Sequence, residues 1–274
     1  MKVRKRALSS GWYPIHESEV DKYLKGWGIT GSELGTARAA VIPHAGWYYS
    51  GKIAAHTISH MEKNLDTIIV AGGHLPPGAD IHMADEGGFQ VPGGVLECDK
   101  ELSTFIKQEF HVKSDIYTDN TVEIQLPLVY NHWPNCKILW LRLPPDIVVA
   151  DLADRLYQRG VDSGRKIAVI GSTDLTHYGD SYGFSPAGYG KKGLEWVKNG
   201  NDHRIIEAMV NLDIDRTLQL GNEEKAACSV GGASFAVAWA LKCGIEKGRC
   251  LDYYTSYDIQ PADSFVGYAG ILYE

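Results

Sequence analysis

The sequence contains no hydrophobic run of the length that a membrane span requires. None of its apolar stretches approaches the roughly 20 residues that cross a bilayer. The basic N-terminal stretch Lys2–Arg6 leads into Ser9-Ser10-Gly11, not into the apolar core of a signal peptide. We therefore expect no membrane partner and no secretory signal.

Cysteines are few, odd in number and widely spread. No two of them have a Cys-x-x-Cys spacing, so the pattern favours neither a disulfide scaffold nor a structural zinc site. Reduced thiols in a cytoplasmic protein fit this distribution best. The five residues are Cys98, Cys136, Cys228, Cys243 and Cys250.

Positive charge and the common nucleotide motifs are also scarce. The formal net charge of -7 disfavours binding to nucleic acid or to an anionic membrane, since both need a cationic face. There is no Walker loop, no Gly-x-Gly-x-x-Gly after a strand, no Gly-x-Ser-x-Gly and no His-Glu-x-x-His. Nucleotide-dependent enzymes and serine hydrolases therefore have no support in the sequence.

The sequence does contain an alternation of short apolar runs and amphipathic segments. This order predicts an α/β protein with a mainly parallel or mixed sheet, helices on both faces, and a single domain over residues 1–274. We expect strands at 39–42, 66–71, 137–143, 166–170, 251–257 and 266–272. We expect helices at 17–27, 51–58, after a cap at Asp99, and at 147–159, 202–211, 214–220 and 234–243.

Three of the expected strands end in turns that carry functional side chains. The strand before Pro43 leads to His44, the strand before Gly72 leads to His74, and the strand before Gly171 leads to Asp174 and His177. In open α/β sheets, ligands bind outside the carboxyl ends of the strands. The sequence therefore predicts that imidazoles and a carboxylate gather at one end of the sheet, as in a metal site or an acid–base site.

Each of these residues also has a structural interpretation. His44 is compatible with a simple turn or capping role, although the same strand-end arrangement at His74 favours a functional role. Asp174 can orient the His177 imidazole or share proton transfer with it, and it can equally be a helix N-cap with His177 in the first turn. The two roles of Asp174 are compatible with each other.

Two further residues leave alternatives open. Cys228 precedes an apolar helix, where a helix N-terminus favours the thiolate that ligates metals, but a buried and inert thiol is an equal interpretation. Glu123 lies among apolar neighbours, so it is either exposed on an alternating segment or buried with a partner.

Taken together, these segments resemble the Memo family, which is related in fold to the class III extradiol ring-cleaving dioxygenases. The resemblance covers nearly the whole chain in the same order. It is carried by Ser10–Pro14, Pro43–Gly51, the strand ending in His74, Val122–Pro127, Ser172–Gly179, Cys228 and Gly267–Gly270.

The resemblance implies a metal site made of His44, His74 and Cys228. It places Asp174 and His177 beside that site as second-shell or acid–base residues. Related proteins are linked to copper or iron and to redox or dioxygenase-like activity, and animal members are linked to phosphotyrosine-peptide binding.

The chain departs from the family pattern at two positions. The family typically has a histidine three residues before the glutamate of the Glu-x-x-Leu-Pro element, where this chain has Asn120. A second family histidine, next to the one that ends the second strand, is Leu75 here. Acid–base roles at these positions do not carry over, and a different substrate is expected.

The hypothesis that follows is a mononuclear non-haem iron oxygenase with Fe(II), or else Cu or Zn, acting on a small-molecule substrate with dioxygen. In it, His177 transfers protons and Asp174 fixes the His177 tautomer. Non-catalytic binding of a peptide or small ligand, and zinc-assisted hydrolysis, are the alternatives. Four aromatic residues either line a pocket for a planar substrate or pack as core: Trp47, Tyr48, Tyr49 and Tyr178.

Overall fold

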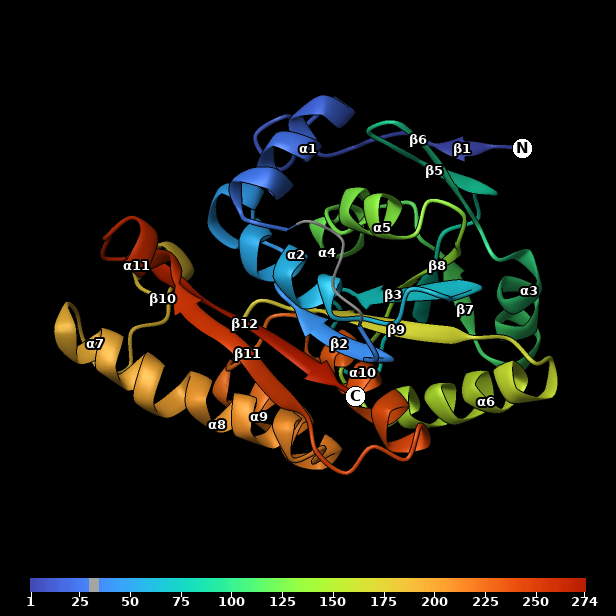
Figure 1. Cartoon of the computed structure of the whole chain (residues 1–274). Coiled ribbons are helices and arrows are strands. Elements are labelled where there is room, and N and C mark those ends of the chain that lie inside the picture. The colour runs from blue at the N-terminus through green and yellow to red at the C-terminus, as the bar shows by residue number, and fades with distance from the viewer. Residues whose placement is uncertain (30–34) are drawn as a thin grey trace.

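Four parallel strands form the centre of the sheet in the computed structural model, which describes residues 1–29 and 35–274. Their order is β2 (Ala39–Ile42), β9 (Ile167–Ser172), β3 (Thr67–Gly72) and β8 (Lys137–Arg142). Nearly all their residues are buried, because helices cover both faces of a parallel sheet. Figure 1 shows this centre between two helical layers.

Antiparallel strands extend the sheet on both sides, so it is mixed. Next to β2 lies β12 (Phe265–Tyr273), which also pairs with β11 (Arg249–Thr255) and β10 (His177–Tyr178). Next to β8 lies β4 (Ile81–Met83), which runs antiparallel to β8 and parallel to β7 (Val112–Ser114).

The two faces of the sheet bury separate hydrophobic cores, because successive strand residues point to opposite faces. Val41 and Ile69 belong to one core, whereas Ile42 and Ile68 belong to the other. The first core contacts α3 (Lys100–Glu109), α6 (Val148–Asp162), α8 (Asp202–Val210), α9 (Ile214–Glu224) and α10 (Val230–Lys242). The second contacts α1 (Glu17–Gly26), α2 (Lys52–Ser59), α4 (Asn120–Glu123) and α5 (Leu126–His132).

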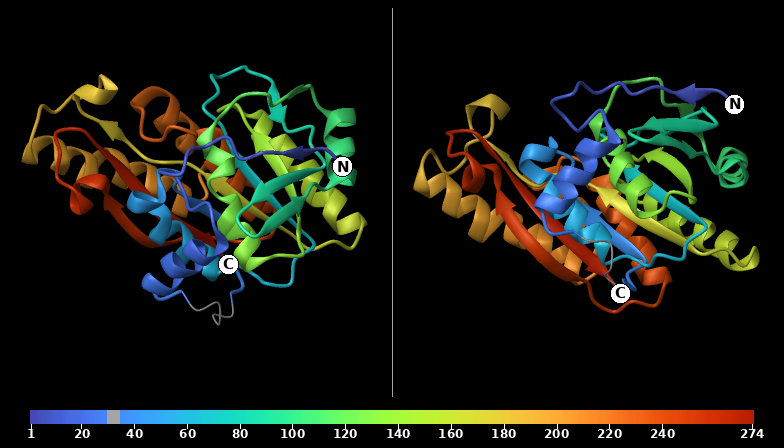
Figure 2. Two further views of the ribbon diagram at one scale, coloured as in Figure 1. Left: turned by 90° about the horizontal axis from the view of Figure 1, so that it is seen from above. Right: turned by 45° about the horizontal axis from the view of Figure 1, so that its top comes forward.

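A small second sheet covers one end of the molecule. It consists of β1 (Val3–Arg4), which pairs with β5 (Gly88–Val91), and of β6 (Gly94–Glu97), which closes a hairpin with β5. Figure 2 shows this sheet at the end opposite α7 (Lys191–Trp196). A short α11 (Ser256–Ile259) connects β11 to the segment before β12.

The predicted α/β class is confirmed. The predicted strands of the main sheet and the predicted helices that cover it are also present. The Asp99 cap is also present, because its carboxylate accepts the Leu102 N–H at 3.1 Å. Three helices are longer than predicted: α10 begins at Val230, α9 continues to Glu224 and α6 continues to Asp162. The sequence does not predict the small sheet, β4, β7 or β10, because runs of two to four residues carry little periodicity.

No helix within residues 1–29 and 35–274 combines the length and the apolar character that a membrane crossing requires.

Candidate metal centre

Three candidate residues lie in equivalent positions after parallel strands. His44, His74 and Asp174 each follow the last residue of their strand, in β2, β3 and β9 respectively, by two positions. The register pairs Ile42 with Ser172 across β2 and β9, so these strands end at the same level. The sheet therefore brings the three side chains together at its carboxyl end, as the sequence predicted.

Cys228 reaches the same place because α10 approaches the sheet very closely. A Cβ atom on Gly232 would lie 2.4 Å from the Ala71 carbonyl oxygen, so only glycine permits this packing. The Cys228 N–H donates to the Asp174 carbonyl oxygen at 3.2 Å, which joins the turn before α10 to the turn after β9.

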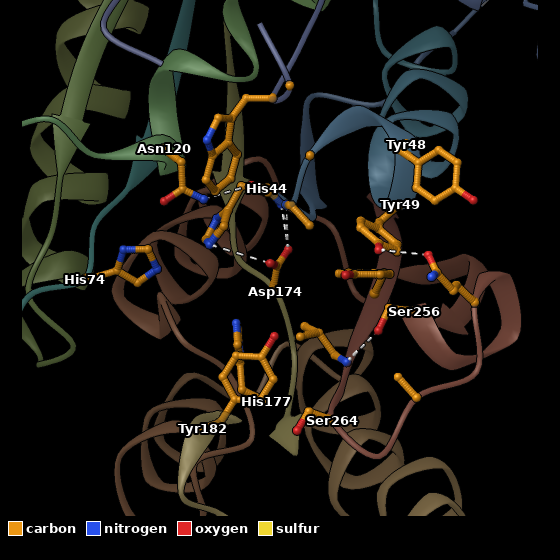
Figure 3. Close-up of a pocket in the computed structure, with 18 of the residues that line it drawn as sticks. His44, Tyr48, Tyr49, His74, Asn120, Asp174, His177, Tyr182, Ser256 and Ser264 are labelled. Carbon is orange, nitrogen blue, oxygen red and sulfur yellow. Dashed lines mark hydrogen bonds and ion pairs between the residues drawn. The ribbon is translucent and has the colours of Figure 1, made fainter. Parts of the chain in front are cut away.

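His44, His74 and Cys228 form a group that can hold a metal ion. Their ligand atoms all lie within 4.8 Å of one another. Cys228 Sγ lies 3.2 Å from His44 Nε2, and the two imidazole centroids are 5.1 Å apart. Figure 3 shows the His44 and His74 rings on the same side of a cavity.

Both histidines make a hydrogen bond through Nδ1, and His44 Nε2 also contacts Cys228 Sγ. His44 Nδ1 lies 3.3 Å from Ser172 Oγ, which also accepts a hydrogen bond from Gln125 Nε2 at 3.0 Å. His74 Nδ1 lies 3.0 Å from an Asp119 carboxylate oxygen. Two imidazole nitrogens and one sulfur are a donor set that iron, copper and zinc accept, so the residues present fit a bound metal.

The electrostatic environment favours a neutral His44. Burial, reinforced by the nearby His74, lowers the pKa of His44 to about 3, so the ring keeps the unprotonated nitrogen that binds metals. Of the two interpretations that the sequence leaves open for Cys228, its surroundings favour the buried, protonated thiol. Burial and the adjacent Asp174 carboxylate raise the pKa of Cys228 well above its usual value.

Asp174 holds the turn that carries His44. One carboxylate oxygen accepts the N–H groups of His44 at 2.7 Å and Ala45 at 3.2 Å, and the other lies 4.0 Å from His44 Nε2. Burial raises the pKa of Asp174, although His177 and the two N–H groups act in the opposite direction. Asp174 is therefore not a helix N-cap, since the segment continues into β10.

His177 also lines the cavity and lies below His44 and Asp174 in the view of Figure 3. Its Nδ1 lies 3.2 Å from the Leu175 carbonyl oxygen, and because a carbonyl only accepts, Nδ1 carries the proton. The prediction that Asp174 fixes this tautomer is therefore wrong. Burial lowers the pKa of His177 while Asp174 opposes the shift, which leaves a neutral ring with an unprotonated Nε2.

A buried carboxylate holds the turn between Asp174 and His177. Asp202, at the start of α8, accepts the Thr176 N–H at 3.0 Å and the Tyr253 hydroxyl at 2.8 Å. Burial raises the pKa of Asp202 to about 7, and these hydrogen bonds act in the opposite direction.

Four of the five candidate residues, all but Cys228, line a cavity of about 660 Å³. Its lining includes His44, His74, Asp174 and His177, together with aromatic and neutral polar side chains (Figure 3). The aromatic rings are Trp12, Tyr48, Tyr49, Tyr182 and Tyr268, and the polar groups include Asn120, Ser256, Gln260 and Ser264.

Only two of the four predicted pocket aromatics line this cavity. Tyr48 and Tyr49 do, whereas Tyr178 stacks on Phe265 at a centroid distance of 5.2 Å. Trp47 lines a neighbouring cavity of about 420 Å³, which shares Trp12 and Tyr48 with the first. The loop 184–190 does not line the main cavity, and the Tyr178 hydroxyl donates to the Gly188 carbonyl oxygen at 2.7 Å.

The structure decides the alternatives for Glu123. Its carboxylate is buried and accepts the Leu8 N–H at 2.8 Å, the Ala7 N–H at 3.0 Å and the Tyr13 hydroxyl at 2.9 Å. Glu123 therefore anchors the N-terminal segment that brings Trp12 to the cavity. Its role is structural.

Sequence reasoning missed the residues that support the histidines. Gln125 donates to Ser172 and also, at 2.7 Å, to the Pro43 carbonyl. The only local signal of Asp119 is that of an N-cap before a short helix. The spacing of residues in the sequence reveals neither the contact of Gln125 with Ser172 nor that of Asp119 with His74, since each joins segments more than 40 residues apart.

The two departures from the family pattern lie in different surroundings. Asn120 lines the cavity and donates to the His44 carbonyl oxygen at 2.9 Å, so an amide here supports the His44 turn. Leu75 is partly exposed and does not line the main cavity.

Several known proteins are similar to this chain over nearly its full length. MEMO1 family proteins of Thermococcus onnurineus and Methanosarcina barkeri are 27% and 28% identical, over 99% of this chain and 99% and 100% of their own. One from Desulfurococcus amylolyticus is 30% identical over 85% of this chain and 81% of its own. Among solved structures, an uncharacterised protein of Escherichia coli K12 matches with a TM-score of 0.48 and 10% identity, over 85% of this chain and 99% of that one.

The family model described as Memo-like protein matches residues 4–272. Its span includes the three strand-end turns, Cys228 and the closing strand. The chain belongs to the Memo family.

Proposed function

We propose that this protein is a metal-dependent oxidoreductase, a mononuclear non-haem Fe(II) dioxygenase that acts on a small aromatic substrate. The observation that carries the proposal is the His44, His74 and Cys228 group, whose ligand atoms lie within 4.8 Å of one another at a cavity of small-molecule size. The partners are the small-molecule substrate and dioxygen.

The ligand set supports a site with open coordination positions. Three protein ligands do not fill the coordination sphere of iron, and non-haem Fe(II) oxygenases use such open positions for substrate and dioxygen. Those enzymes usually use a carboxylate as the anionic ligand, whereas a thiolate is softer and also suits copper or zinc. Metal binding would require loss of the Cys228 proton.

His177 is the residue best placed to accept a proton from the substrate. Its Nδ1 proton is directed to the Leu175 carbonyl, so the unprotonated Nε2 is free to accept. Its pKa is lowered by burial, which keeps this base neutral at pH 7. Tyr182 packs edge-on against the His177 ring at a centroid distance of 4.8 Å and restricts its rotation.

The cavity walls support a planar substrate that carries polar groups. The faces and edges of five aromatic side chains supply apolar contact area, and the hydroxyl and amide groups of Ser256, Gln260 and Ser264 supply hydrogen-bond partners. Tyr49 and Gln260 already bond to each other at 3.3 Å, so a ligand that enters here competes with a weak, exposed contact.

Anaerobic loading with Fe(II) tests the proposal. Bound iron is measured by mass spectrometry, and dioxygen uptake is measured with a panel of catechols and other hydroxylated aromatics. We expect one iron per chain and substrate-dependent uptake, both lost in His44→Ala and His74→Ala. Stoichiometric iron without uptake would instead support a non-catalytic binding protein, and full activity in either variant would contradict the assignment of the ligands.

The donor set itself supports zinc-assisted hydrolysis as a second candidate. Catalytic zinc sites use three protein ligands drawn from histidine, cysteine and carboxylates, with a water in the fourth position. His177 is the base that such a reaction requires. Zinc in the purified protein together with ester hydrolysis under anaerobic conditions would favour this function over dioxygen chemistry.

A further inference from the structure

Packing holds the His74 imidazole only in part, through an edge-on contact with the His44 ring at a centroid distance of 5.1 Å. The His74 side chain is 41% exposed, and it sits in the loop that follows β3. An exposed histidine samples several rotamers and both neutral tautomers, and only one tautomer presents an unprotonated Nε2. A metal ligand in this position needs a partner that selects the ring orientation.

Asp119 is that partner. Its carboxylate oxygen lies 3.0 Å from His74 Nδ1. Because a carboxylate only accepts, this contact places the proton on Nδ1 and leaves the Nε2 lone pair free. The same aspartate begins α4, where its other oxygen accepts the Thr121 N–H at 2.9 Å.

Arg142 fixes Asp119 in turn. Its guanidinium lies at the end of β8, with one nitrogen 3.2 Å from Asp119 and another 3.0 Å from Asp115. All three side chains are at most 7% exposed. An ion pair removed from water in this way is held far more firmly than a surface pair, so Asp119 has little freedom to turn away from His74.

The backbone of the His74 loop is shaped to approach Arg142. Gly73 has a φ of 114°, a conformation that side chains rarely adopt, and a Cβ there would lie 2.8 Å from Arg142 Cβ. The loop after β3 therefore packs directly on the end of β8. This close approach brings His74 within reach of the carboxylate that Arg142 holds.

We propose that Asp119, held by Arg142, is a positioning residue that selects the ring orientation and tautomer of His74 for metal binding. The inference rests on the proposed function, since it gives His74 a metal to bind. Partners of this kind change metal affinity by about 10- to 100-fold. Asp119 touches the ligand and not the metal, so its effect passes through His74.

The variant Asp119→Ser separates positioning from helix capping. Serine is as good an N-cap as aspartate, so the contact with the Thr121 N–H is kept while the carboxylate beside His74 is lost. Asp213→Ser is the matched control. Asp213 caps α9 by accepting the Arg216 N–H at 2.9 Å. Its replacement by serine is the same chemical change at a cap away from the metal centre.

Two measurements are made on the full chain. The first is the dissociation constant for Fe(II), obtained anaerobically by competition with a chromophoric chelator. The second is the tautomer of His74 in the metal-free protein, read from the nitrogen chemical shifts of its ring. Thermal unfolding of each variant shows whether the fold is retained.

We expect Asp119→Ser to weaken Fe(II) binding at least 10-fold and to give a mixture of His74 tautomers, while Asp213→Ser changes neither. Binding within twofold of the unmodified protein, or an unchanged Nδ1–H tautomer, would overturn the proposal. If the unmodified protein binds no metal, the proposed function fails, and the tautomer measurement then decides the positioning role by itself.

Discussion

His44 and His74 come from turns at the same end of the sheet, but the protein holds them in different ways. The His44 side chain is 1% exposed, and it is fixed by Ser172 and by the Asp174 contacts to its turn. The His74 side chain is 41% exposed and depends on one ion-paired carboxylate. One imidazole is positioned by packing and the other by a charge network.

This difference has consequences for both stability and function. A buried, neutral imidazole contributes to the fold whether or not a metal is present, whereas an exposed one contributes little until it binds something. An exposed imidazole is also accessible to a metal ion from solvent. We therefore expect changes on the His44 side to affect folding and binding together, and changes at His74 itself to affect binding alone.

The largest expected effect comes from breaking the charge network at its centre. Arg142→Met leaves the buried carboxylates of Asp115 and Asp119 without their cation, which is expected to cost about 3 to 5 kcal/mol of unfolding free energy. Urea denaturation measures this loss of unfolding free energy. Arg155→Met, which breaks exposed contacts to Asp151 and Glu109, serves as the control, with an expected cost of about 1 kcal/mol or less. Equal losses of unfolding free energy in the two variants would show that the buried Arg142 network stabilises the fold no more than exposed ion pairs do.

The next effect concerns Asp202, which holds the turn between Asp174 and His177. Its folded pKa of about 7 exceeds the unfolded value near 3.8, so unfolding releases a proton between pH 4 and pH 7. The stability contributed by Asp202 therefore falls as pH rises through that window, by about 1.4 kcal/mol per unit.

Asp202→Asn lacks this titration. Between pH 5 and pH 7, the variant is expected to gain about 2.3 kcal/mol relative to the unmodified protein, because a carboxyl with a pKa of about 7 is still half protonated at pH 7. Urea unfolding at both pH values gives the comparison. A stability difference that is the same at both pH values would mean that Asp202 is already ionised in the folded state.

His44→Ala is expected to destabilise the metal-free protein by about 2 kcal/mol, because it removes a buried ring and leaves Ser172 without that contact. Thermal and urea unfolding in the presence of a chelator measure this cost. An unchanged stability would contradict the view that packing positions His44.

The smallest effect on stability is expected for His74→Ala. Substitution of a side chain that is 41% exposed normally changes the unfolding free energy by about 0.5 kcal/mol or less. The same variant is expected to lose metal binding. A large loss of stability at His74, comparable to that of His44→Ala, would remove the distinction between the two ligands.

The sequence predicted the parts of this site that depend on local patterns. The apolar run before Pro43 identifies a buried strand, and the turn after it places His44 at the carboxyl end of the sheet. The same reasoning applies to His74 and to Asp174. These residues were found because strand ends and their turns are encoded within a few neighbouring positions.

The remaining parts depend on contacts between distant segments. Cys228 reaches the centre only because Gly232 lets α10 pack on β3, and no local pattern reports that approach. The high pKa of Cys228 follows from burial that the sequence does not show. Asp119 is read locally as a helix cap, and its contact with His74 appears only when the loop after β3 packs on the end of β8.

The most direct test of the metal centre is a crystal structure of the protein loaded anaerobically with Fe(II), with anomalous data collected on both sides of the iron absorption edge. We expect one iron peak bonded to His44 Nε2, His74 Nε2 and Cys228 Sγ. An iron peak elsewhere, or iron at this site without Cys228 as a ligand, would contradict this expectation.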